Sequence, residues 1–161
     1  AQGTANQTNY GWQFKDISLA EDELIDEAGK PLNKKVKSLP ELTLEKLLKC
    51  NYIGNLTGIY NASKIGKITV KNLRKRQDWL LWIEALKRTN NKVLGIEESL
   101  AYYRVRKNSM SSNKVNLLKY NFLVFRRGLG FSFFKSLWYR FRFLLEPFFK
   151  KSKHVIPLPE N

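Results

Sequence analysis

The clearest repeating pattern of apolar residues lies between residues 76 and 88. Apolar side chains recur there at the i, i+3, i+4 and i+7 positions that share one face of an α-helix: Trp79, Trp82, Ile83 and Leu86. The pattern predicts an amphipathic helix over 76–88. We expect its later apolar residues to face a core, and Trp79 to face either the core or a binding site.

Shorter helical patterns occur before and after this segment. Thr43 can cap a short helix over 44–49, whose leucines fall on one face. Residues 113–154 contain two further apolar helical faces, and Ser132 can cap the second of them. The two faces comprise Leu118, Phe122 and Phe125, and then Phe134, Leu137, Trp138, Phe141 and Leu145. Pro147 is expected to end or kink the second helix.

Four other segments have the β-branched, aromatic or alternating pattern of strands. They are residues 12–19, 51–60, 93–96 and 100–105. Residues 26–31 predict a turn, and residues 33–41 predict a basic loop that contains a proline. Together with the helices, these segments predict an α/β fold with a few strands and three or four helices.

Composition limits the chain to one ordinary core and favours acidic partners. The 161 residues include 29 Lys and Arg against 14 Asp and Glu, a net charge of +15. The chain contains one cysteine, Cys50, and one histidine, His154. These counts argue against a disulfide scaffold, a zinc finger and a histidine-dependent hydrolase. The sequence contains no run of about 18 uncharged apolar residues, so it does not predict a membrane-spanning helix.

The first residues do not predict a secretory signal, because residues 1–10 lack a basic start and an apolar core. The chain also begins at Ala1 without an initiating Met. We therefore expect a processed or trimmed product with further sequence upstream.

The segment 74–82 is the strongest candidate for chemistry. It sets one carboxylate, Asp78, at the start of a helix among cations and indole rings. A carboxylate within about 3 Å of a hydroxyl nucleophile can take its proton, and neighbouring rings can stack on a sugar. The alternative is that Asp78 only caps the helix.

Residues 42–150 resemble the C-terminal, acceptor-side half of bacterial family 2 glycosyltransferases. Three stretches carry the resemblance, in the family's order: LEKLLK and NYIGNLT (44–49 and 51–57), RKRQDW and LW (74–79 and 81–82), LAYYRVRKNS and SSNK (100–109 and 111–114). These enzymes have a GT-A fold, use nucleotide-sugar donors, invert the anomeric centre and build bacterial surface polysaccharides. The resemblance implies that this chain has part of that α/β fold.

The resemblance also implies roles for particular residues. Asp78 matches the general base that deprotonates the acceptor hydroxyl. Acceptor binding falls on four residues: Asn55, Thr57, Gln77 and Trp79. Contact with the donor diphosphate falls on a basic loop: Arg104, Arg106, Lys107 and Ser109. No metal ligand is expected from this chain.

The resemblance further divides the chain into three parts. Residues 1–112 correspond to the end of the nucleotide-sugar half and the acceptor-side subdomain, residues 113–154 to an amphipathic basic aromatic tail, and residues 155–161 to a C-terminal tail. The rest of the family's donor-binding half, with its metal motif, would precede this chain. We therefore expect a fragment that is inactive alone and binds no cofactor, with Mg²⁺ or Mn²⁺ held by the other half. We interpret Glu21-Asp22-Glu23 as surface charge.

The expected partners follow from these features. They are a nucleotide-sugar donor, a glycan or lipid-linked acceptor and an anionic membrane surface. The tail over 113–154 can lie in a membrane interface or cover the domain, and the sequence favours neither. We expect a cytoplasmic protein, peripheral at the inner face of the membrane. The alternatives are a non-catalytic basic module that binds nucleic acid or membrane, and a scaffold without turnover.

Overall fold

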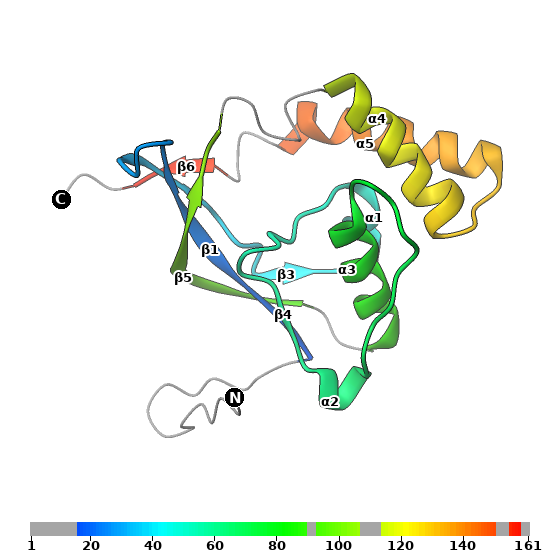
Figure 1. Ribbon diagram of the computed structural model, residues 1–161, viewed down its shortest axis with the longest axis horizontal. Coiled ribbons are helices and arrows are strands. Elements are labelled where there is room, and N and C mark those ends of the chain that lie inside the picture. Colours follow the sequence, from blue (N-terminus) through cyan, green and yellow to red (C-terminus); the bar gives the residue numbers. More distant parts are fainter. Residues whose placement is uncertain (1–15, 90–92, 107–113, 151–154, 159–161) are drawn as a thin grey trace.

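The computed structural model describes residues 16–89, 93–106, 114–150 and 155–158. A six-stranded mixed sheet lies on one side, and the helices gather on the other (Figure 1). The predicted mixed α/β fold is therefore confirmed.

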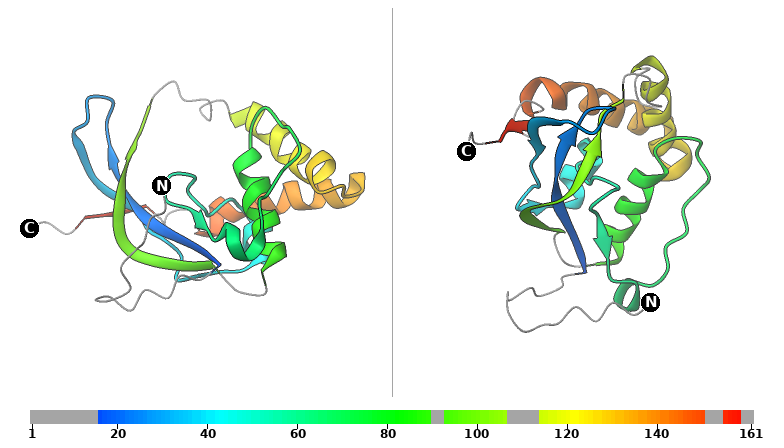
Figure 2. Two further views of the ribbon diagram at one scale, coloured as in Figure 1. Left: turned by 60° about the horizontal axis from the view of Figure 1, so that its bottom comes forward. Right: turned by 60° about the vertical axis from the view of Figure 1, so that its left-hand side comes forward.

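Strand β1 (Ile17–Ile25) is at the centre of the sheet. It pairs in parallel with β5 (Val93–Arg104) and antiparallel with β2 (Pro31–Val36). The short strand β4 (Ile59–Tyr60) pairs with the start of β1, and β3 (Glu41–Leu42) pairs with the start of β5. Strand β5 curves strongly along its length, as Figure 2 shows.

The interpretation of Glu21-Asp22-Glu23 as surface charge is wrong for its first two residues. Glu21 is 1% exposed and Asp22 is 5% exposed, because both lie on β1 between β2 and β5. The Lys35 ammonium lies 2.6 Å from Oε2 of Glu21, so this buried carboxylate has a cation beside it. Strand β1 thus extends beyond the predicted end at residue 19.

Other strand predictions also need correction. Part of the predicted loop 33–41 belongs to β2, and the two predicted strands over 93–105 form one strand, β5. The predicted strand over 51–60 is mostly a loop, in which only residues 59–60 form β4. A Cβ on Gly58 would lie 2.4 Å from the Trp82 ring, so the loop packs against this indole at its glycine. By contrast, the predicted turn after β1 is confirmed.

The helices predicted over 44–49 and 76–88 are confirmed. Helix α1 (Leu44–Lys49) starts after Thr43, whose hydroxyl oxygen accepts a hydrogen bond from the Lys46 amide at 3.3 Å. Helix α3 (Gln77–Arg88) buries the residues of its predicted apolar face, Trp79 included. A further short helix, α2 (Ala62–Ile65), begins after Asn61.

The C-terminal segment packs against α1 and α3. It contains α4 (Lys114–Leu123), a π-helical turn η1 (Val124–Gly128) and α5 (Phe133–Lys150). The turn η1 contributes Val124 and Phe125 to the core, both 0% exposed. Helix α5 continues through Pro147, where the sequence predicted an end or a kink. Strand β6 (Val155–Pro157), in the segment expected to be a tail, pairs with β2.

Within the described residues, no helix combines the length and the apolar character needed to cross a membrane.

Candidate functional site

The candidate site is the first turn of α3. Arg76 adopts a left-handed backbone conformation with φ 69°, and α3 begins at the next residue. Asp78 is the second residue of the helix and is half-buried. The N-cap position belongs to Arg76, which makes no side-chain capping hydrogen bond. Asp78 is therefore not the N-cap residue.

Asn51 holds the Asp78 carboxylate in place. Its amide nitrogen Nδ2 donates a hydrogen bond to Oδ2 of Asp78 at 2.9 Å. Asn51 lies just beyond α1, so this bond joins the end of α1 to the start of α3 across 27 positions of the chain. The oxygen of the same side-chain amide, Oδ1, is buried without a hydrogen-bond partner among the described residues. Asn51 was not among the predicted site residues, although it lies within a stretch that carries the family resemblance.

Trp79 lies behind Asp78 in the core. Its side chain is 0% exposed, and its Nε1 donates to the Leu47 carbonyl oxygen at 2.8 Å. Its ring centroid is 5.4 Å from that of Phe125 and 5.6 Å from that of Phe143. In this arrangement the indole presents no free face to a sugar, contrary to the expected acceptor contact. Trp79 instead supports the turn that carries Asp78.

The Arg76 guanidinium lies over the same aromatic cluster. It is 5.9 Å from the Trp79 ring and 5.9 Å from the Phe143 ring. Its Nε is buried without a hydrogen-bond partner in the described part of the chain. A cation is therefore placed two residues before Asp78, on rings that fix its position.

Three other residues were predicted to bind the acceptor. Gln77 directly precedes Asp78, and Asn55 and Thr57 lie in the loop that begins with Asn51. Asn55 is exposed in the loop 51–58. Thr57, in the same loop, is buried, and its hydroxyl donates to the Ala20 carbonyl oxygen at 2.9 Å. Gln77 is exposed beside Asp78, and its Nε2 donates to Oδ1 of Asn72 at 2.7 Å. The loop that begins with Asn51 therefore carries two of the expected acceptor residues.

A second carboxyl group lies beneath this loop. A Cβ on Gly54 would lie 3.1 Å from Oδ2 of Asp22, so the loop passes close to this acid. Burial raises the pKa of Asp22 above its ordinary value. This contact could not be predicted from local patterns, because Asp22 and the loop are distant along the chain.

The donor-side candidates lie at the far end of β5. Arg104 is exposed, and its Nη1 donates to the Glu27 carbonyl oxygen at 2.6 Å, at the turn between β1 and β2. Arg106 is exposed two residues later. Lys107 and Ser109 lie outside the described residues. The described contacts connect Arg104 to the hairpin rather than to Asp78.

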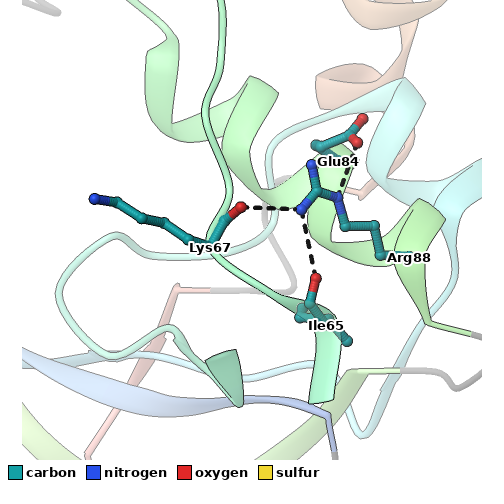
Figure 3. A network of polar contacts seen from close by, with 4 residues as sticks. All are labelled: Ile65, Lys67, Glu84 and Arg88. Carbon is teal, nitrogen blue, oxygen red and sulfur yellow. Dashed lines mark hydrogen bonds and ion pairs between the residues drawn. The ribbon is translucent and has the colours of Figure 1, made fainter. Parts of the chain in front are cut away.

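Arg88 fixes the opposite end of α3. Its Nη1 donates to the carbonyl oxygens of Ile65 at 3.4 Å and Lys67 at 3.1 Å, and its Nε lies 3.1 Å from Oε1 of Glu84 (Figure 3). These bonds hold the start of the connection that runs from α2 to Asp78.

The acidic residues of the described segments do not form a metal site. No group of three or more His, Cys, Asp or Glu side chains is gathered there in a way that could hold an ion. Glu21 has Lys35 beside it, and Asp22 lies under the loop at Gly54. The described residues therefore do not fit a divalent metal.

One curated protein from Bacillus subtilis (strain 168) is similar to this chain. It is named "Putative teichuronic acid biosynthesis glycosyltransferase TuaG", and it is 36% identical over 115 residues. The match covers 71% of this chain and 45% of the relative, so the chain matches less than half of the relative's length. No protein-family model matches the chain, and no solved structure matches it.

Proposed function

We propose that this chain is the acceptor-side part of an inverting glycosyltransferase that acts in the synthesis of a bacterial surface polysaccharide. The observation that carries this proposal is the 36% identity over 115 residues to the Bacillus subtilis protein named as a glycosyltransferase of teichuronic acid biosynthesis. The family 2 type, the GT-A fold and the nucleotide-sugar donor belong to the same proposal. They rest on the resemblance of residues 42–150.

In the proposed reaction, Asp78 is the general base. Its carboxylate takes the proton of the acceptor hydroxyl, whose oxygen then bonds to the anomeric carbon of the donor sugar. The bond from that carbon to the diphosphate oxygen breaks, and the nucleoside diphosphate leaves with the electron pair. The attack and departure on opposite faces invert the configuration. The hydrogen bond from Asn51 at 2.9 Å and the buried Trp79 support this role, because they fix the carboxylate before the acceptor arrives.

The remaining expected residues have secondary roles in this proposal. Asn55, Thr57 and Gln77 orient the acceptor near Asp78, with Thr57 acting through the loop that it fastens to Ala20. Arg104, Arg106, Lys107 and Ser109 contact the donor diphosphate, which guanidinium groups can bind through paired hydrogen bonds. Trp79 positions the turn.

The proposal includes a second segment of polypeptide that binds the donor. The 45% coverage of the relative is compatible with such a segment. In the GT-A family that segment holds a divalent metal, Mg²⁺ or Mn²⁺, which neutralises charge on the diphosphate. We propose that the chain does not transfer sugar alone and that the assembled enzyme works at the cytoplasmic face of the membrane, where an acceptor linked to a lipid would be presented.

A chimaera tests the proposal. The matched 115-residue segment of the Bacillus subtilis relative is replaced by the corresponding part of this chain, and acceptor-dependent release of nucleoside diphosphate is measured with UDP-sugars and GDP-sugars. We expect turnover by the chimaera and none by the isolated chain. Asp78→Asn should lower the rate about 10²- to 10⁴-fold, the usual contribution of a general base.

Glu84→Gln is the matched control, because it removes a carboxylate from the same helix, almost two turns away. The control should keep the rate of the unchanged chimaera. Full turnover by Asp78→Asn would contradict the role of Asp78 as the base. Turnover by the isolated chain would contradict the need for a second segment.

A further inference from the structure

Helix α5 exposes a continuous row of large apolar side chains, which we call the outer face of α5. Its described members are Phe134, Leu137, Trp138, Phe141, Leu144 and Leu145. Phe134 is 80% exposed and Trp138 is 58% exposed. These residues recur at the spacing of one helical face, and several of them line a shallow groove together with Arg140. Contiguous exposed apolar surface of this kind marks an interaction site.

The opposite face of α5 is fixed to the domain. Ser136 is 0% exposed, and its hydroxyl donates to the Ser132 carbonyl oxygen at 2.8 Å. The Tyr139 ring is 5.2 Å from that of Phe125, and the Phe143 ring is 5.6 Å from that of Trp79. The helix is therefore packed on the core through one face while it presents the other outward. The outer face is therefore exposed even though the helix is already packed on the domain.

Cations border the outer face on both sides. By helical spacing, Arg140 follows one edge, and Lys135 and Arg142 follow the other. Lys135 lies 4.3 Å from the Phe131 ring, and Arg142 lies 3.8 Å from Oε1 of Glu45 on α1. Arg126 and Arg127 of the neighbouring turn η1 are also exposed. The acidic residue of α5 is Glu146, beyond the described part of the outer face.

We infer that the outer face of α5 lies in the headgroup region of an anionic lipid bilayer. An apolar face with Trp and Phe, bordered by Lys and Arg, is the pattern of a helix that lies parallel to a membrane surface. The aromatic rings enter the region between headgroups and acyl chains, while the cations meet lipid phosphates. A second copy of the chain would bring the same cations against one another across a two-fold axis, so the charge pattern favours the lipid. This inference does not depend on transferase activity.

Vesicle flotation of the 161-residue chain tests the inference. The vesicles contain phosphatidylcholine alone or equal parts of phosphatidylcholine and phosphatidylglycerol. We expect the chain to float with the anionic vesicles and to remain behind with the neutral ones. Trp138→Ser with Phe141→Ser should weaken the partition at least about tenfold, because the substitutions remove two large rings that would enter the apolar part of the bilayer. Leu100→Ser with Tyr102→Ser, which removes two exposed apolar side chains of β5, should change it less than about twofold.

Two further measurements separate lipid contact from misfolding and from charge alone. Arg140→Gln should weaken the partition about fivefold, whereas Lys37→Gln, at an exposed position just after β2, should leave it unchanged. In a Trp12→Phe background, acyl chains that carry bromine should quench Trp138, since Trp79 and Trp82 are buried. Circular dichroism checks that each variant is folded.

Three results would overturn the inference. The chain could stay with the soluble fraction in the presence of anionic vesicles. The serine pair on α5 could bind vesicles as tightly as the unchanged chain. The same pair could instead abolish a dimer or RNA binding, without any effect on lipid, which would assign the outer face to that partner.

Discussion

The start of α3 and the outer face of α5 depart from the usual arrangement of a protein in opposite ways. At the start of α3, a carboxylate is half-buried beside a fully buried indole. On α5, large aromatic rings are left in water. The first arrangement holds the proposed general base in a fixed position, and the second leaves the apolar surface that we propose contacts lipid. Polar groups inside and apolar groups outside both indicate function, but of different kinds.

The two regions share a single aromatic cluster. Phe143, on the inner face of α5, lies 5.6 Å from Trp79, and Trp79 directly follows Asp78. Helix α5 therefore supports the first turn of α3 from behind while its other face points outward. Residues of the same type, tryptophan and phenylalanine, are packed in the core on one face and exposed on the other.

The largest expected difference is between the two tryptophans. Trp79→Ala should lower the free energy of unfolding by about 3–5 kcal/mol, because it empties a core site and removes the bond to the Leu47 carbonyl. Trp138→Ala should change it by less than about 0.5 kcal/mol, because more than half of the side chain is already exposed. Denaturant unfolding followed by circular dichroism measures both values. Equal losses would mean that the two regions do not differ as described.

A smaller effect is expected at Asn51. Asn51→Ala removes the donor that holds Asp78 and should reduce transfer by the chimaera about tenfold, the value of one hydrogen bond to a charged group. The matched control is Asn61→Ala, which removes the N-cap of α2 and should cost about 1 kcal/mol of stability without slowing transfer. If both variants slow transfer equally, the effect of Asn51 is only on stability.

The smallest effect concerns the pH dependence of stability at Asp22. Because burial raises the pKa of this carboxyl in the folded chain, the folded state binds its proton more tightly than the unfolded state. The resulting stabilisation is complete below the ordinary pKa of 3.8 and is lost as the pH rises through the raised value. Relative to Asp22→Asn, the unchanged chain should therefore lose stability as the pH increases. Unfolding curves over this range measure the trend, and a difference independent of pH would contradict it.

Local features could be predicted from the sequence. The cap at Thr43 depends on a residue three positions away, and the helix at Gln77–Arg88 depends on spacing within the segment. The sequence predicts a strand for the loop after α1, because Ile and Thr favour strands. In the structure, Gly58 lets this loop pack closely against the Trp82 ring.

Features that depend on distant residues could not be predicted in this way. Glu21 is buried because β1 is central, and this position follows from pairing with β5, far along the chain. The bond between Asn51 and Asp78 likewise depends on how α1 packs beside α3. On α5, one apolar pattern was expected, but the folded chain uses Tyr139 and Phe143 on the inner side and leaves the predicted pattern outside.

The most direct test of the central claim separates donor binding from transfer in Asp78→Asn. Donor affinity is measured by calorimetry on the chimaera, and transfer is measured in a single turnover with acceptor present. A general base that acts on the acceptor predicts unchanged donor affinity with a large fall in the single-turnover rate. An unchanged single-turnover rate would contradict the claim, as would a fall that is explained entirely by weaker donor binding.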